Sequence, residues 1–247
     1  MIKPFLILQL RPEDDTSDDE YAAICRYGGL PPEQTRRIRI EREGIPSDLR
    51  LEDYSGVIVG GSPFDISTPD ADKSSLQKKI ESDFYRLFDR LVPADFPFLG
   101  ACSGNGLLGS WLGTPITPRY GEPVGCFELE LTAEGRKDPL LAGCPPRIPA
   151  LLGHKEACDR LPDGATLLLR GEACPVQMFR VGEHVYATQF HPEGDAEGFI
   201  LRIQAYRHHG YFQPEEADAL IERIRPARTP EANAILHRFV ERYSQQQ

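Results

Sequence analysis

The sequence predicts an α/β fold with an open, mostly parallel sheet, helices on both of its faces and a small antiparallel extension. Through residues 1–101, short apolar runs bounded by glycine or proline alternate with segments of helical periodicity, as in doubly wound sheets. From Ile116 to Tyr186 the pattern changes to short alternating runs rich in Gly and Pro, which predicts antiparallel strands. We expect residues 1–247 to form a single domain with a helical C-terminal extension at about 195–247.

The first strand is expected over residues 4–10. A signal peptide is a weaker interpretation of this segment, because the apolar stretch is short, lacks a small-residue cleavage site and is followed at once by acidic residues. Further strands are predicted wherever an apolar run is short or alternates with polar residues. They are expected at residues 36–41, 57–59, 97–101, 126–131, 165–169, 176–180 and 185–189.

Helices are predicted from apolar periodicity and from end signals. Residues 18–27 form a short expected helix that the pair Gly28-Gly29 ends. The C-terminal helix is expected to begin at Thr229-Pro230-Glu231, where an N-cap residue precedes a proline in the first helical position. A long helix over residues 73–91 carries one apolar stripe. The stripe consists of Leu76, Ile80, Phe84, Leu87, Phe88 and Leu91.

Composition excludes several classes of protein. A formal net charge of −10 argues against a protein that binds a nucleic-acid backbone. No apolar run approaches the roughly 20 residues that span a bilayer. The six cysteines are scattered without a C-x-x-C pair, so we expect reduced thiols in a cytoplasmic protein and no structural zinc site.

Cys102 is the candidate nucleophile. The run Gly100-Ala101-Cys102-Ser103-Gly104 joins a buried strand to a helix, and small neighbours permit the sharp turn of a nucleophile elbow. The helix N-terminus is expected to favour the thiolate, and the N–H of Ser103 is placed to stabilise an oxyanion. On this motif alone, a structural cysteine beside tight-turn glycines stays open as the alternative.

His191 and Glu193 are the candidate base and its orienting acid. The strand at residues 185–189 ends at His191, so the imidazole lies on the same sheet edge as Cys102 if the two strands are parallel. A neutral imidazole there can take the thiol proton and return it to a leaving amine. Glu193 follows after a stiff proline and can hold the imidazole in one tautomer. In isolation, His-Pro-Glu is more often a surface turn.

These motifs together resemble the class I, triad-type glutamine amidotransferase family, and within it stand-alone proteins similar to the glutaminase domain of GMP synthetase. The resemblance covers most of residues 50–195. It rests on the ordered segments Val57-Ile58-Val59-Gly60-Gly61-Ser62, Gly100–Gly104, Leu112-Gly113-Thr114-Pro115-Ile116 and Gln189-Phe190-His191-Pro192-Glu193.

The resemblance implies a flavodoxin-like fold and hydrolysis of glutamine through a γ-glutamyl thioester. By position, Cys102 is then the nucleophile, His191 the base and acid, and Glu193 the orienter. Gly61 matches the loop that lends a second oxyanion N–H opposite Ser103. The resemblance implies a small-molecule substrate and neither a metal nor an organic cofactor.

The sequence departs from the family pattern at two positions. Gly106 stands where the family has a glutamine that helps to hold the substrate, and Ser62 intervenes before Pro63 in the glycine-rich loop. No synthetase domain follows the glutaminase-like region, so we expect any ammonia acceptor on another chain. A γ-glutamyl peptide or conjugate hydrolase is the alternative enzyme. A catalytically silent domain that binds a partner or a metabolite is the alternative from another class.

Three other features are weighed against ordinary structural roles. The acidic run at residues 13–20 could be a cation site or a lid, but a solvated loop leading into a helix is the better prediction. His154 is a candidate substrate contact, with a structural histidine favoured. His208-His209 is expected on the surface of a helix, without a third metal ligand nearby.

Overall fold

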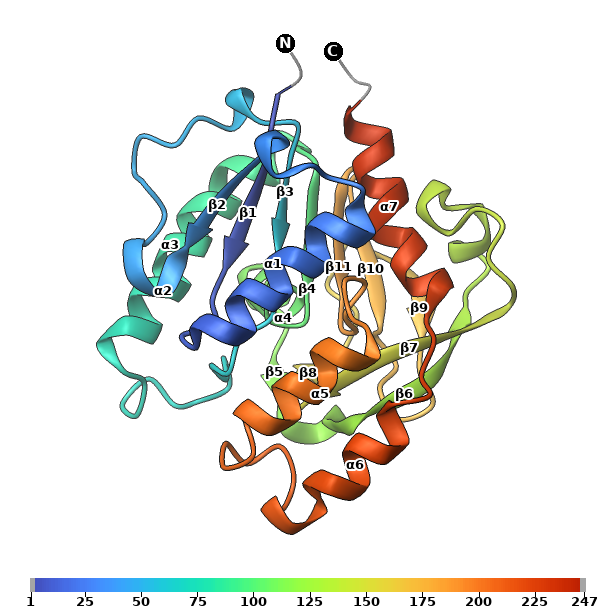
Figure 1. Ribbon diagram of the computed structural model, residues 1–247. Helices are drawn as coiled ribbons and strands as arrows, with labels where there is room; N and C mark the ends of the chain where they lie inside the picture. The colour runs from blue at the N-terminus through green and yellow to red at the C-terminus, as the bar shows by residue number, and fades with distance from the viewer. Residues whose placement is uncertain (1–2, 245–247) are drawn as a thin grey trace.

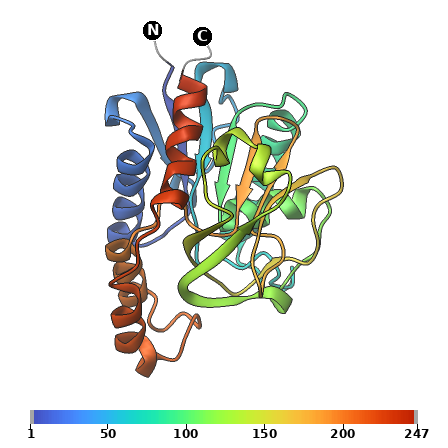
Figure 2. The same ribbon diagram turned by 90° about the vertical axis from the view of Figure 1, so that its right-hand side faces the viewer.

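The computed structural model describes residues 3–244, and it places a nine-stranded mixed sheet between two layers of helices (Figures 1 and 2). Met1 and Ile2 of the N-terminal apolar segment and the last residues of the C-terminal extension, 245–247, lie outside the described residues. The strand order is β2-β1-β3-β4-β11-β10-β9-β6-β7. The predicted mostly parallel sheet with an antiparallel extension is therefore confirmed.

The parallel half contains the strands with continuous apolar runs. In β1 (Phe5–Gln9), β3 (Gly56–Val59) and β4 (Phe98–Ala101) every residue is buried, as expected for strands covered on both faces. The edge strand β2 (Thr35–Arg39) alternates instead, with one buried residue. On the other side, β11 (Val185–Thr188) runs parallel to β4, with Thr188 opposite Ala101. The segments that follow β4 and β11 therefore emerge side by side.

The antiparallel half continues the same sheet beyond β11. In this half, neighbouring strands pair antiparallel. A separate two-stranded antiparallel sheet lies apart from it. The strands of this half are β10 (Met178–Val181), β9 (Thr166–Arg170), β6 (Glu122–Leu131) and β7 (Arg147–His154), and the small sheet pairs β5 (Ile116–Thr117) with β8 (Ala157–Cys158). The sequence analysis missed β7, because proline interrupts its apolar run at residue 149.

Helices cover both faces of the sheet (Figure 2). One face carries α1 (Asp14–Gly28), α5 (Ala196–Ala205) and α7 (Pro230–Ser244), and α6 (Ala217–Ile224) packs on α5. The other face carries α3 (Ser75–Leu91) and α4 (Ser103–Trp111), with the single turn α2 (Ile40–Glu43) beside α3. The two main apolar clusters lie on opposite faces. Within residues 3–244 no helix combines the length and the apolar character needed to cross a membrane.

Three predictions made along the chain are wrong. The acidic run at residues 13–20 is not a solvated loop, because α1 already begins at Asp14 and Glu20 is completely buried. Leu76 does not belong to the buried stripe of α3, since it lies near the N-terminus of the helix and is 36% exposed. His208-His209 lies in the turn after α5, not on a helix. The division of the chain into one domain with an extension stays a prediction.

We expect Phe239→Ala to lower the free energy of unfolding by about 3–5 kcal/mol, because it empties a buried site between two layers. The Phe239 ring on α7 is fully buried and contacts the rings of Phe5, Tyr186 and Tyr243. Urea denaturation followed by circular dichroism measures the change. Glu241→Ala on the exposed side of the same helix is the control, with an expected change within about 0.5 kcal/mol. Equal losses in both variants would contradict the packing argument.

Candidate active site

Cys102 sits on the sharp turn between β4 and α4. Its backbone has φ 50° and ψ −94°, a left-handed conformation that costs a residue with a side chain about 1–3 kcal/mol. The turn is fixed on both sides, because the Cys102 N–H donates to the carbonyl of Thr188 (2.8 Å) and its carbonyl accepts from Asn105 (3.0 Å). A Cβ on Gly100 would lie 2.9 Å from the backbone of Gly104. The predicted elbow geometry is therefore present, and glycine is needed at 100 for close approach.

The Cys102 thiol is protonated in the resting protein. Burial raises its pKa to about 12, although the nearby charge of Arg11 opposes this shift. The expectation of a thiolate at the helix N-terminus is therefore wrong for this state, since the loss of solvation outweighs the favourable charges. The residue is only half-buried, so reagents have a route to it. A base must take the proton when the sulfur attacks.

His191 and Glu193 form a buried pair just beyond the end of β11. His191 is held by its backbone N–H, which donates to the carbonyl of Leu151 (3.0 Å). Its Nδ1 lies 2.6 Å from Glu193 Oε1, so the carboxylate favours the tautomer with the proton on Nδ1 and leaves the Nε2 lone pair free. Arg202 Nη2 donates to the same Glu193 oxygen (3.2 Å). The prediction that Glu193 orients His191 agrees with this geometry.

The charges of this pair are set by burial and by each other. Burial lowers the pKa of His191, and Glu193 only partly offsets this effect. Burial works to raise the pKa of Glu193, but His191 and Arg202 outweigh it and hold that pKa well below its usual range. The resting site therefore contains a neutral imidazole beside a carboxylate. Among the described residues, no hydrogen bond reaches the Cys102 sulfur, and catalytic contacts are often loose before substrate binds.

Glu20 of α1 is a central residue that the sequence analysis missed. Its carboxylate accepts hydrogen bonds from Arg11 Nε (2.7 Å), Gln9 Nε2 (3.0 Å) and the N–H of Gly61 (3.1 Å). Arg202 Nη2 lies 4.0 Å from it. One carboxylate thus joins α1, the glycine-rich loop and α5. The available signal was the helical spacing of Glu20 with the apolar Ala23 and Ile24, which marks the buried face of α1.

Gly61 lies where the loop approaches the catalytic residues most closely. A Cβ at this position would lie 2.7 Å from Arg11 Nη2 and 2.8 Å from His191 Cε1, so no larger residue fits without movement. Its N–H donates to Glu20 (3.1 Å). The proposed oxyanion role of this N–H stays a prediction and requires that hydrogen bond to be given up. Next along the loop, the Ser62 and Ser103 hydroxyls are 2.8 Å apart.

Two small cavities flank Cys102. The larger, about 40 Å³, is lined by Arg11, His191 and Arg202 together with apolar side chains. The smaller, about 20 Å³, is lined by residues of several segments, many of them polar, with Phe64 and Ile116 as apolar members. The lining also includes Ser103, Gly106, Asp65, His154, Lys155 and Glu156.

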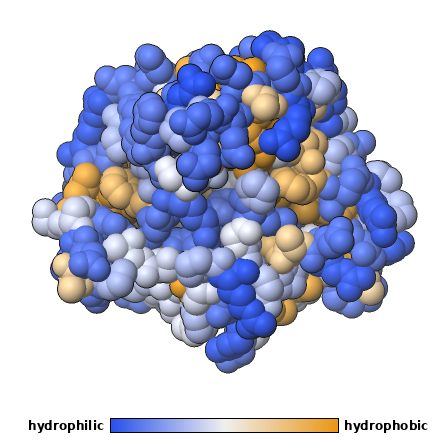
Figure 3. Space-filling model, turned by 90° about the horizontal axis from the view of Figure 1, so that it is seen from below, coloured by the Kyte–Doolittle hydropathy of each residue, from blue (hydrophilic) through white to orange (hydrophobic). Residues whose placement is uncertain are grey.

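Tyr211, in the connection after α5, lines both cavities. Its hydroxyl donates to the carbonyl of Ser62 (3.3 Å), and Lys155 Nζ lies 4.8 Å from its ring centroid. Viewed from below, the face toward which β1 points is largely hydrophilic, with apolar residues in separate patches (Figures 1 and 3). Tyr211 is therefore part of the wall that the two cavities share.

The Gly106 position is filled by another part of the chain. A Cβ there would lie 2.8 Å from Ile66 Cδ1, so the loop after Gly61 occupies the space that a side chain at 106 would need. Glu156 fixes this loop by accepting hydrogen bonds from the N–H groups of Ile66 (2.7 Å) and Ser67 (2.8 Å). A side chain at position 106 would therefore require Ile66 to shift.

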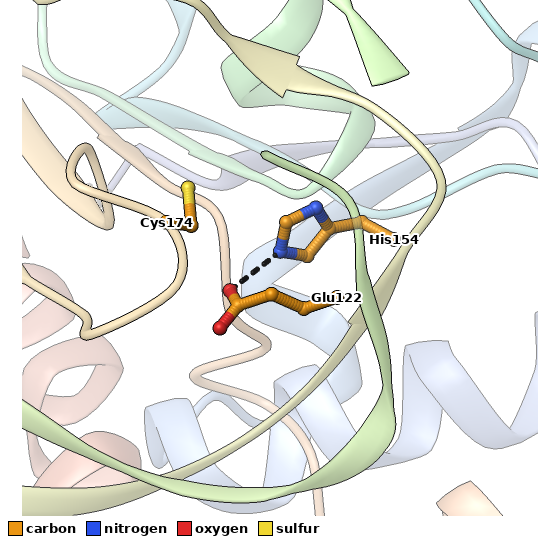
Figure 4. A group of neighbouring side chains, drawn as sticks. All are labelled: Glu122, His154 and Cys174. Atoms are coloured by element: carbon orange, nitrogen blue, oxygen red, sulfur yellow. Dashed lines mark hydrogen bonds and ion pairs between the residues drawn. The ribbon is translucent and has the colours of Figure 1, made fainter. Parts of the chain in front are cut away.

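His154 belongs to a buried polar cluster at the start of β6 (Figure 4). Its Nε2 contacts Glu122 Oε2 (3.0 Å) and its Nδ1 contacts the carbonyl of Glu156 (3.0 Å). Cys174 lies beside the pair, and the three possible metal-ligand atoms are within 4.8 Å of one another. Gln177 Nε2 also donates to Glu122 (2.5 Å). Both ring nitrogens are already engaged, which favours the structural role, and the substrate role of His154 stays a prediction.

We expect Glu20→Ala to lower the free energy of unfolding by about 3–5 kcal/mol, because it leaves the buried guanidinium of Arg11 without its carboxylate. Urea denaturation measures this change. Asp15→Ala, an exposed acid in the first turn of the same helix, is the control and should change stability little. A stability of Glu20→Ala close to that of Asp15→Ala would show that the carboxylate does not hold these segments together.

We expect Tyr211→Ala to raise the rate at which iodoacetamide modifies Cys102 by about tenfold, which corresponds to about 1.4 kcal/mol of easier access. The change removes the ring between the two cavities and its hydrogen bond to Ser62. Peptide mass spectrometry measures the rate, and the exposed Cys126 of the same protein is the internal control. An unchanged ratio of the two rates would show that Tyr211 does not limit the access of reagents to Cys102.

Comparison with known proteins supports the resemblance. The family model described as "Glutamine amidotransferase class-I" matches residues 33–199. A subunit of the glutamine-hydrolyzing GMP synthase of Pyrococcus abyssi is 26% identical over 164 residues, which cover 64% of this chain and 79% of that protein. Gamma-glutamyl peptidase 3 of Arabidopsis thaliana is 27% identical over 173 residues, covering 68% of this chain and 66% of the relative.

Solved structures show the same fold. The crystal structure of a glutamine amidotransferase from Thermotoga maritima superimposes with a TM-score of 0.76 at 21% sequence identity, covering 98% of this chain and 99% of that one. The expected flavodoxin-like architecture is therefore confirmed. The matched family segment spans β3, the elbow at Cys102 and the strand that ends before His191. From this match, the chain belongs to the class-I glutamine amidotransferase family.

Proposed function

We propose that this chain hydrolyses the amide bond of glutamine or of a related γ-glutamyl amide, with Cys102 as nucleophile, His191 as base and acid, and Glu193 as orienter. The observation that carries the proposal is the 2.6 Å contact between His191 Nδ1 and Glu193, which leaves Nε2 free in the cavity that Cys102 also lines. Membership of the class-I amidotransferase family supports the reaction class.

The proposed reaction has two halves. As the Cys102 sulfur attacks the amide carbon, His191 Nε2 takes the thiol proton, and the tetrahedral intermediate carries an oxyanion. The C–N bond then breaks, His191 returns the proton to the leaving nitrogen, and a γ-glutamyl thioester remains. Water attacks the thioester while His191 takes its proton and gives it back to the sulfur, which restores the thiol and releases the γ-carboxylic acid. A neutral His191 and a protonated Cys102 are the starting states that this cycle needs.

Backbone N–H groups are the proposed oxyanion donors. The N–H of Ser103, at the N-terminus of α4, is the first. Gly61 is the second predicted donor, but its N–H is engaged with Glu20 (3.1 Å). The neighbouring N–H of Ser62 donates no hydrogen bond within the described part of the chain, so it is free to serve as an alternative donor.

A second chain is the proposed destination of the ammonia if glutamine is the substrate. The Pyrococcus abyssi relative is named as one subunit of a glutamine-hydrolyzing GMP synthase, and a separate synthetase would play the corresponding part here. We also propose a cytoplasmic location, in keeping with six free cysteines. Neither a metal nor an organic cofactor enters the proposed cycle.

We expect 6-diazo-5-oxo-norleucine, a glutamine analogue that alkylates thiols, to add once to the wild-type protein and not to Cys102→Ala. The reagent needs both a reactive Cys102 and a pocket that accepts a γ-glutamyl group. Intact-protein mass spectrometry detects the adduct. Cys126→Ala is the matched control, since it removes an exposed thiol and should still be labelled.

Two other results of the same labelling experiment would contradict the proposal. If a general thiol reagent modifies Cys102 but 6-diazo-5-oxo-norleucine does not, Cys102 is reactive and the pocket does not accept a γ-glutamyl group. No reaction of Cys102 with either reagent, together with no turnover of any γ-glutamyl amide, would reject the enzyme and favour a silent domain that binds a partner or a metabolite.

A further inference from the structure

The two cavities beside Cys102 differ in chemistry. His191 lines the larger cavity but not the smaller one. Because His191 delivers the proton to the leaving nitrogen in the proposed cycle, the leaving group must lie on the side of the larger cavity. The γ-glutamyl part then extends toward the smaller cavity, where Lys155 and Asp65 form a half-exposed ion pair. These two charges suit the carboxylate and ammonium groups of an amino acid.

The larger cavity contains a buried cation with unpaired hydrogen-bond donors. Arg202 is only 7% exposed, and it lines this cavity. Its Nη2 donates to Glu193, but Nε and Nη1 are buried and have no partner among residues 3–244. Unpaired buried donors on a cation are costly, and a hydrogen-bond acceptor that reached them would satisfy them, with an anion gaining the attraction of the charge as well.

The rest of the cavity wall is mostly apolar, with Arg11 as a second cation. Arg11 is 4% exposed, and its paired carboxylate is Glu20. Hydroxyl groups are present in the wall as well, on Ser62, Tyr206 and Tyr211. The aliphatic and purely aromatic side chains of the wall are Val124, Phe199, Ile203 and Phe212. The cavity therefore offers a cationic end and an apolar body, which matches an amino acid with an apolar side chain and a free carboxylate.

We propose that the substrate is a γ-glutamyl conjugate whose leaving amine is an apolar amino acid or short peptide, with its carboxylate bound by Arg202. This inference rests on the proposed function and names its substrate class. The scissile bond is the amide C–N bond, its nitrogen receives the proton from His191, and water supplies the hydroxyl group of the released γ-carboxyl. Tyr211 and Phe212 line the cavity, so the leaving amine would lie against them.

The test compares two substrates that differ in one group, γ-glutamyl-phenylalanine and γ-glutamyl-phenylalaninamide. For the wild-type protein we expect kcat/KM for the free acid to exceed that for the amide by about 10- to 100-fold, the effect of one charge-assisted hydrogen bond. Release of phenylalanine or its amide, followed by chromatography, gives both rates. Glutamine is measured alongside them and is expected to be a poorer substrate than the free acid.

Arg202→Gln separates recognition of the carboxylate from support of Glu193. Loss of the contact to Glu193 lowers both rates alike, whereas loss of carboxylate binding brings the ratio of the two rates close to one. Arg207→Gln is the matched control, because Arg207 pairs with Asp218, away from the cavity, and should keep the ratio. If Arg202→Gln fails to fold, Arg202→Lys keeps the charge without the planar fork and should give an intermediate ratio.

The outcomes are distinguishable. A wild-type preference for the free acid that Arg202→Gln abolishes supports the proposal. Equal rates for acid and amide, or a preference that survives Arg202→Gln, overturns it. Turnover of glutamine without turnover of either conjugate also overturns it but leaves the proposed function standing. If no γ-glutamyl compound reacts and 6-diazo-5-oxo-norleucine does not label Cys102, both proposals fail.

Discussion

The parallel pairing of β4 with β11 is the constraint on which the site depends. These strands lie far apart in sequence, yet Thr188 stands opposite Ala101, so the residues after each strand emerge at the same sheet edge. The hydrogen bond from the Cys102 N–H to the Thr188 carbonyl extends this pairing into the elbow. A shift of one residue would turn each buried side chain of β11 to the other face and separate His191 from Cys102. Packing on both faces of the sheet therefore sets the distance between Cys102 and His191.

The second layer of organisation is electrostatic. Glu20 and Glu193 both lie near Nη2 of Arg202, at 4.0 Å and 3.2 Å, and Glu20 also pairs with Arg11. Charges so deeply buried are stable only as a set, because each guanidinium offsets the desolvation of a neighbouring carboxylate. This set ties α1 and α5 to the catalytic end of the sheet. Burial is the main cause that lowers the pKa of the His191 imidazole, and the nearby charges of Arg202 and Arg11 add to it against the opposing effect of Glu193.

The sequence predicted the parts of this protein that follow from local pattern. Short apolar runs indicated β1, β3 and β4, and a glycine-flanked cysteine and a strand-ending histidine indicated the candidate triad. The sequence did not reveal features that depend on long-range packing. Glu20 looks like one acid in an acidic run until α5 and the glycine-rich loop surround it. Likewise, burial reversed the expected charge state of Cys102, and local spacing contains no information about how much solvent a fold removes.

The left-handed backbone at Cys102 has a consequence for how the chain can change over time. At φ 50° glycine has a lower conformational energy than any residue with a side chain, so replacing the cysteine with glycine would release backbone strain. If the thiol were not needed, a single substitution of Cys102 by glycine would increase folding stability by removing this strain. A cysteine at this strained turn therefore lowers the folding stability of the chain relative to glycine, and folding stability alone does not favour it.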